Sequence, residues 1–203
     1  AIYGAALSSR LRLTPIASID NNFIGTTVRV SGQVVDLRSN DDGHLFLKIK
    51  DSSGGVISVP VFSRLRQALG EPIELLDFVQ VRGEVKLYRN EFEVVPAEPT
   101  DIQVVHTAPL PISSITRDNL GAPVKVQGVV VDRSIVGSGH LLLTLGENGS
   151  QLTVFVPGWI AGNGFPQVDI GNVICASGWL QLYNEVLELK ITSPGCVRVI
   201  EGA

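Results

Sequence analysis

Hydrophobic and polar residues alternate through most of the chain, and this period of two is typical of β-strands that bury one face. Between residues 28 and 35, for example, Val28, Val30 and Val34 face one way while the polar side chains between them face the other. Five segments of the first half share the alternation: 28–35, 44–50, 57–61, 79–87, and the pair Phe92 and Val94. The pattern predicts five β-strands in this half.

Residues that favour turns separate these segments, at 39–43, 51–55 and 89–90. One stretch, from Ser63 to Leu69, has helical spacing instead, through Leu65, Ala68 and Leu69. We therefore expect a short helix between the third and fourth strands.

The second half repeats the first. Pro15 returns 96 positions later as Pro111 with the hydrophobic pattern around it, and after one deleted residue Gly83 returns 95 positions later as Gly178. A repeat of this length is a duplicated domain, because solenoid units run to roughly 20–50 residues. The sequence predicts two domains, 1–106 and 107–203, joined by a short linker that Pro109 and Pro111 stiffen.

Glycine occupies the middle of two predicted strands in each half, at Gly32 and Gly83 and again at Gly128 and Gly178. Glycine normally weakens a strand, but a small closed barrel must bend its long strands sharply and glycine permits this. Five strands, two of them bent, with a helix between the third and fourth, describe an OB-fold barrel. The predicted fold is all-β, with two consecutive five-stranded OB-fold barrels.

The motifs within one half, and their order, resemble those of a known family. In the first half the motifs are Val28-x-Val-x-Gly-x-Val, Leu45-x-Leu-x-Ile-x-Asp51-x-x-Gly54, Val59-x-Val61-Phe62 and Val79-x-Val-x-Gly83-x-Val. They resemble the nucleic-acid-binding OB domains attached to class II aminoacyl-tRNA synthetases, polymerases and secreted bacterial nucleases. The second half departs from the pattern at Glu147, which replaces the strand-ending Asp, and at the Gly-Trp-Ile-Ala-Gly stretch where the helix should begin. The resemblance implies nucleic-acid binding, although most of its positions are structural.

The charge balance restricts that expectation. The chain has 16 Lys and Arg against 20 Asp and Glu, a net charge of −4. Residues 1–106 hold 11 against 13 and residues 107–203 hold 5 against 7, so each half carries −2. Affinity for nucleic-acid backbones comes largely from neutralising phosphates, so only a local basic surface could support binding.

Such a surface is predicted in the first half, on the outer face of strands two and three and the loops beside them. Its residues alternate aromatic rings with cations, which suits stacked bases and phosphates of a single strand. They are Arg38, His44, Phe46, Lys48, Lys50, Phe62, Tyr88 and Arg89. The alternative is a solvated sheet face whose Phe46 is covered by the neighbouring domain.

The second half lacks these cations, because Thr144 and Gly146 stand where Lys48 and Lys50 are in the first. It has Phe155, Trp159 and Trp179 instead. An aromatic, nearly uncharged face fits protein contact, either with a partner protein or in a homo-oligomer, better than phosphate binding. Packing beneath a connecting loop explains the two tryptophans about as well.

The sequence offers little chemistry. It has no Gly-x-x-x-x-Gly-Lys phosphate loop, its three histidines lack metal-ligand spacing, and its carboxylates are scattered at turns and strand ends. We expect no enzyme activity, no cofactor and no metal. Cys175 and Cys196 either form one disulfide or remain two free thiols, and no Cys-x-x-Cys is present.

Together these features predict a non-enzymatic tandem OB-fold module that binds single-stranded nucleic acid weakly through its first barrel. Two alternatives remain: an extracytoplasmic module that binds a protein or saccharide, or accessory domains of a larger nuclease or polymerase. The chain contains no Met and begins with Ala1, so we expect that a segment upstream was removed and that residues 1–12 form an ill-ordered arm. These features favour an extracytoplasmic location over a cytoplasmic one without fixing either, and no apolar run is long enough to span a membrane.

Overall fold

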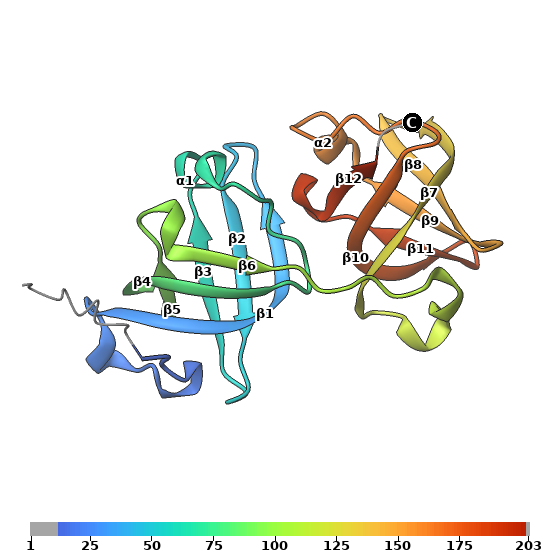
Figure 1. Cartoon of the computed structure of the whole chain (residues 1–203). Coiled ribbons are helices and arrows are strands. Elements are labelled where there is room, and N and C mark those ends of the chain that lie inside the picture. Colours follow the sequence, from blue (N-terminus) through green and yellow to red (C-terminus); the bar gives the residue numbers. More distant parts are fainter. Residues whose placement is uncertain (1–11, 202–203) are drawn as a thin grey trace, which may run out of the picture.

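The computed structural model describes residues 12–201 and shows two β-barrels that an extended segment joins (Figure 1). Residues 1–11 of the expected N-terminal arm lie outside the described residues. The first barrel consists of β1 (Thr27–Ser39), β2 (Leu45–Lys50), β3 (Val56–Val61), α1 (Ser63–Ala68), β4 (Phe78–Tyr88), β5 (Glu91–Val95) and β6 (Ile102–Val105). Its strands follow the order β1-β2-β3-β5-β4, and β4 pairs with β1 to close the barrel. The predicted OB-fold topology is confirmed.

The second barrel repeats this order. It consists of β7 (Pro123–Val136), β8 (His140–Glu147), β9 (Ser150–Val156), α2 (Gly158–Ala161), β10 (Val173–Tyr183), β11 (Val186–Lys190) and β12 (Val197–Glu201). Its strands follow β7-β8-β9-β11-β10, with β10 pairing back to β7. Within residues 12–201, six short 3-10 helices lie outside the barrel strands: η1 (Ile16–Ser18), η2 (Asn21–Phe23), η3 (Pro99–Asp101), η4 (Ile112–Ser114), η5 (Arg117–Asn119) and η6 (Pro194–Cys196).

The structure differs from the sequence prediction in the length of the first strand and in the number of strands in each barrel. The first strand runs on to Ser39, well past the predicted end at residue 35, because its second part leaves β4 and pairs with β2. A bulge between Val34 and Asp36 marks this change of partner. Each barrel also gains a sixth strand, β6 beside β4 and β12 beside β10, from the segment that leads out of the barrel.

The mid-strand glycines lie where strands change partners. A Cβ at Gly32 would lie 2.6 Å from the carbonyl oxygen of Lys50, and a Cβ at Gly83 would lie 2.6 Å from that of Val95. At Gly178 a Cβ would meet the Lys190 carbonyl oxygen in the same way. Since the main chain of a partner strand occupies the space that a side chain needs, these positions require glycine for steric reasons and not only for flexibility.

Replacing Gly32 by Ala should therefore destabilise the protein by roughly 1–3 kcal/mol, since β1 and β2 would have to separate to admit the methyl group. The matched control is Gly70→Ala, because a Cβ at Gly70 meets nothing within 4 Å and its φ is not left-handed. Urea unfolding followed by circular dichroism measures both changes. Equal stabilities for the two variants would contradict the steric explanation.

The lead-in to each barrel is tied to the end of the second strand by a carboxylate. Asp51 Oδ2 accepts a hydrogen bond of 2.7 Å from the Ile16 amide, and Glu147 Oε2 accepts one of 2.7 Å from the Ile112 amide. Glu147, a departure from the family motif, therefore performs the same task as Asp51 with a side chain that is longer by one methylene.

A cluster of buried charges joins the two barrels. Lys125, on β7 of the second barrel, places its Nζ 2.8 Å from Glu74 Oε2 and 2.5 Å from Asp77 Oδ1, in the segment before β4 of the first barrel. All three side chains are at most 1 % exposed. Arg198 Nε lies 2.6 Å from Glu74 Oε1, and His106 Nδ1 lies 2.9 Å from Asp77 Oδ2. We call these five residues the inter-barrel cluster.

Hydrogen bonds between opposite charges shift the pKa values of Glu74 and Lys125 against the effect of burial. Burial acts to raise the pKa of Glu74, but hydrogen bonds from Arg198 and Lys125 outweigh it and hold the pKa below its ordinary 4.5. Burial likewise acts to lower the pKa of Lys125, and hydrogen bonds to Asp77 and Glu74 raise it above 10.5. Glu74 and Lys125 are therefore charged near neutral pH.

Lys125→Met should lower the free energy of unfolding by about 3–5 kcal/mol, because the variant leaves two buried carboxylates without their shared cation. The control is Lys86→Met, which removes an exposed lysine from β4 and should change stability by about 0.5 kcal/mol or less. Chemical denaturation of both variants measures the difference. A loss no larger than that of the control would show that the cluster does not hold the barrels together.

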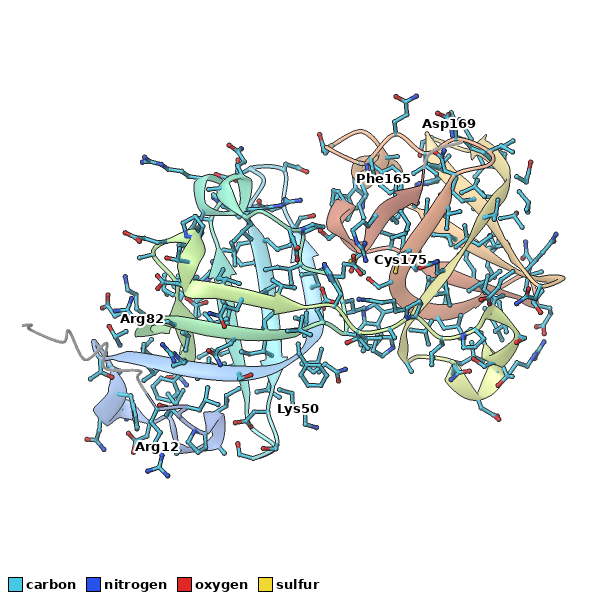
Figure 2. All side chains as sticks on the ribbon, in the orientation of Figure 1. Arg12, Lys50, Arg82, Phe165, Asp169 and Cys175 are labelled. Carbon is cyan, nitrogen blue, oxygen red and sulfur yellow. The ribbon has the colours of Figure 1, made fainter. Side chains whose placement is uncertain are left out.

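Cys175 and Cys196 are both buried and free, so the disulfide alternative does not hold in this structure. The two thiols have separate surroundings, because Cys175 Sγ lies 3.9 Å from Glu74 Oε2 whereas Cys196 lies against the main chain of Leu75. Figure 2 shows Cys175 on the side of the second barrel that faces the first. Burial raises the pKa of Cys175 to about 11 and also raises that of Cys196.

Neither thiol should react with a disulfide reagent in the native protein, because burial keeps both protonated and inaccessible. Two thiols should react once the protein is unfolded in guanidinium without a reducing agent. Absorbance at the wavelength of the released thiolate counts them. No reactive thiol in the unfolded chain would show that a bridge forms in solution.

Candidate nucleic-acid interface

Three of the eight predicted site residues of the first barrel, Arg38, Phe46 and Lys48, line a groove on its outer face. Phe46 and Lys48 of β2, Pro60 of β3 and Arg38 of β1 line this groove, whose volume is about 200 Å³. Phe46 is 42 % exposed, so the second barrel does not cover it. We call this feature the β2–β3 groove.

Two aromatic rings near the groove, Phe46 and Phe62, pack against the ring of His44. His44 Nδ1 accepts a hydrogen bond of 2.9 Å from the Ser63 amide at the start of α1. Its ring stands edge-on to Phe62 at 5.4 Å and to Phe46 at 6.4 Å between centroids. His140 makes the equivalent bond, also 2.9 Å, to the Gly158 amide at the start of α2. The repeated histidines therefore have a structural role, because each satisfies a free amide at a helix start.

The cations of the groove have acidic neighbours. Lys48 Nζ lies 3.6 Å from Glu91 Oε2, and Arg38 Nε lies 3.2 Å from Asp36 Oδ2. Glu93 also lines the groove, and burial together with the nearby Glu91 raises its pKa. Sequence reasoning missed these three carboxylates, because β1 and β5 bring them to the face only when the barrel closes. Exposed ion pairs of this kind contribute little, so phosphates can compete for the cations.

Five of the eight predicted residues do not line the β2–β3 groove: His44 and Phe62, and also Tyr88, Arg89 and Lys50. Tyr88 and Arg89 are at the β4–β5 turn, where the Arg89 guanidinium lies 5.2 Å from the centroid of the exposed Tyr88 ring. Arg89 and Asn90 both have positive φ, 47° and 67°, as a two-residue hairpin turn requires. Lys50 is exposed at the far end of β2, at the lower end of the first barrel in Figure 2.

A second and larger groove lies between the barrels. Its volume is about 890 Å³, and we call it the inter-barrel groove. Phe155 of β9, Trp159 of α2 and Trp179 of β10, the aromatic residues that the sequence assigned to protein contact, all line it. Asp36 and Arg38 of the first barrel line its opposite side. Sequence reasoning treated the halves separately and therefore could not place these five residues together.

One group of side chains has the composition of a metal site. Ligand atoms of Glu74, Asp77 and His106 lie within 4.8 Å of one another. The ammonium of Lys125 and the guanidinium of Arg198 already bind the same carboxylates, at 2.5–2.8 Å. These cations supply the positive charge that a metal ion would bring, so the group fits the inter-barrel cluster better than a metal centre.

Among the described residues, no helix has both the length and the hydropathy that crossing a bilayer would require.

Comparison with a family model agrees with the fold of the first barrel. Residues 28–107 match the model of the OB-fold nucleic acid binding domain. This match confirms the resemblance stated from the sequence, for the first barrel. No curated protein matches the chain.

The chain is similar to several solved structures at low sequence identity. A tetrameric p202 HIN2 structure is 14 % identical over 88 % of this chain and 95 % of its own, with a TM-score of 0.48. The OBody AM1L10 bound to hen egg-white lysozyme is 25 % identical over 47 % of this chain and 92 % of its own, with a TM-score of 0.37. Asparaginyl-tRNA synthetase from Entamoeba histolytica is 15 % identical over 54 % of this chain and 27 % of its own, with a TM-score of 0.42.

Proposed function

We propose that the protein is a non-enzymatic binding module whose first barrel binds single-stranded DNA or RNA in the β2–β3 groove. The observation that carries this proposal is the exposed Phe46 ring beside Lys48 and Arg38, on the face that OB-folds use for oligonucleotides. The family match over residues 28–107 supports the same class of ligand.

The arrangement suits a single strand better than a duplex. Exposed rings on strands and turns, at Phe46, Phe62 and Tyr88, offer flat surfaces on which unpaired bases can stack. Stacking of this kind contributes about 1–3 kcal/mol for each base, and it tolerates any sequence because every base has a π-face. A duplex hides these base faces in its own stack, so it could use only the cations.

The charges predict weak binding that depends on salt. Four cations lie on or near the face, at Arg38, Lys48, Lys50 and Arg89, and three carboxylates lie beside them. If all four contact phosphates, the logarithm of the binding constant should fall with the logarithm of salt concentration with a slope of about −3. The net charge of −4 adds long-range repulsion, so stacking must supply much of the affinity.

The double variant Lys48→Glu, Lys50→Glu should bind a fluorescein-labelled oligothymidylate roughly tenfold or more weakly than the parent at low salt, because two phosphate contacts become repulsive. Fluorescence anisotropy at two salt concentrations measures the effect. A matched control, Arg117→Glu with Arg133→Glu, makes the same change in net charge on exposed residues of the second barrel.

An equal loss in the control would mean that net charge, and not the β2–β3 groove, determines binding. No binding by the parent to either DNA or RNA at low salt would reject the proposed function.

A second candidate function is suggested by the outer face of the second barrel. Val129, Val131 and Ile135 of β7 are 40 %, 43 % and 66 % exposed, which favours contact with another protein. A module of this kind could be an accessory part of a larger nucleic-acid enzyme or an extracytoplasmic interaction domain. The anisotropy experiment separates it from the first candidate, since it requires no affinity for oligonucleotides.

A further inference from the structure

The two grooves described above meet at one residue pair. Asp36 and Arg38, on the last part of β1, line both the β2–β3 groove and the inter-barrel groove. The Arg38 side chain is 74 % exposed and is therefore accessible from either side. A ligand in the first groove that contacts Arg38 is therefore in contact with a residue that also lines the second.

The inter-barrel groove carries the chemistry of a stacking site. Trp159 is 49 % exposed, and Phe155 and Trp179 are partly exposed. The His140 ring lies 5.2 Å from Phe155 and completes an aromatic wall. Flat rings with accessible faces bind unpaired bases irrespective of sequence.

The charges on this groove favour an anionic ligand. Among the described residues that line it, Arg38 and Lys190 are cations and Asp36 is the one carboxylate. Asp36 is already paired with Arg38. The groove therefore has a small positive excess on a chain whose net charge is −4, and this charge is complementary to the phosphates of a nucleic acid.

The groove is also held in shape before any ligand arrives. The Thr192 hydroxyl of the second barrel donates a hydrogen bond of 2.8 Å to the carbonyl oxygen of Leu37, which lies between Asp36 and Arg38 on β1. The inter-barrel cluster, whose residues do not line the groove, also joins the two barrels. A preformed groove lowers the entropy cost of binding.

We propose that the single strand bound by the first barrel continues past Arg38 into the inter-barrel groove, where further bases stack on Trp159 and Trp179. This inference rests on the proposed function and extends it. It assigns the aromatic residues of the second barrel to nucleic acid, in place of the protein contact that the sequence suggested.

The chain itself supplies the probe. It contains two tryptophans, Trp159 and Trp179, and both line the inter-barrel groove. Intrinsic tryptophan fluorescence therefore reports on this groove, while the anisotropy of a labelled oligonucleotide reports binding anywhere on the protein. An oligothymidylate of about 12 nucleotides falls within the site sizes that OB-folds use.

Titration with this oligonucleotide should quench the tryptophan fluorescence along the same curve as the anisotropy. Trp159→Ala should weaken binding roughly five- to hundredfold, and Trp159→Phe should restore most of it, because a ring still offers a stacking face. The matched control is Tyr183→Ala, which removes an aromatic ring that is 63 % exposed at the end of β10 and outside the groove. It should bind as the parent does, and circular dichroism confirms that each variant is folded.

Anisotropy that shows binding without any change in tryptophan fluorescence, and with Trp159→Ala binding as the parent does, would overturn this inference while the proposed function stands. No anisotropy change with any oligonucleotide would overturn both. A homodimer in sedimentation that Trp159→Ala dissociates would also overturn it, because the groove would then be an interface between two copies.

Discussion

The buried ammonium of Lys125 between Glu74 and Asp77 is the interaction on which the tandem arrangement depends. Two barrels on a short linker could adopt several relative positions, and their cores do not require any one of them. Lys125 fixes one relative position, because its side chain reaches from the second barrel to two buried carboxylates of the first. Separating the barrels would require all three charges to be solvated again. Arg198 and His106 complete this arrangement at its edge.

The cluster also shows how the duplicated halves diverged. Asp77 Oδ2 accepts a hydrogen bond of 2.8 Å from the Glu74 amide. Its counterpart in the repeat, Asn172, accepts a hydrogen bond of the same length from the Asp169 amide. The turn before the fourth strand is therefore kept in both barrels, but only the first keeps the acidic side chain that Lys125 needs. The shared turn occurs in both barrels, whereas the negative charge of Asp77, present only in the first, binds Lys125 and positions the pair.

The sequence predicted much of the fold because each strand buries one face. Alternation predicted the five barrel strands of the first half, and the repeat predicted five more in the second. The repeated Gly32 and Gly83 indicated a closed barrel. The close approach of the Lys50 and Val95 carbonyls explains why glycine stands at these two positions. Alternation in the sequence also predicted that Phe46 lies on the exposed face of its strand. It could not predict that Glu91 and Glu93 would join that face, since parallel pairing of β3 with β5 depends on the closed topology. Nor could it find the inter-barrel groove, because no pattern within one repeat encodes contacts between repeats.

The two barrels contribute different kinds of side chain to the proposed binding surface. To this proposed surface, the first barrel contributes Arg38, Lys48 and the Phe46 ring, and the second contributes two tryptophans and a single lysine, Lys190. Neither set alone is strong: the cations have acidic partners, and the rings have little charge to attract a strand. Arg38 is the residue at which the two sets meet, and it reaches the aromatic groove only because Thr192 and the inter-barrel cluster hold β1 against the second barrel. Buried charges outside both grooves therefore fix the relative position of the two surfaces that the proposal joins.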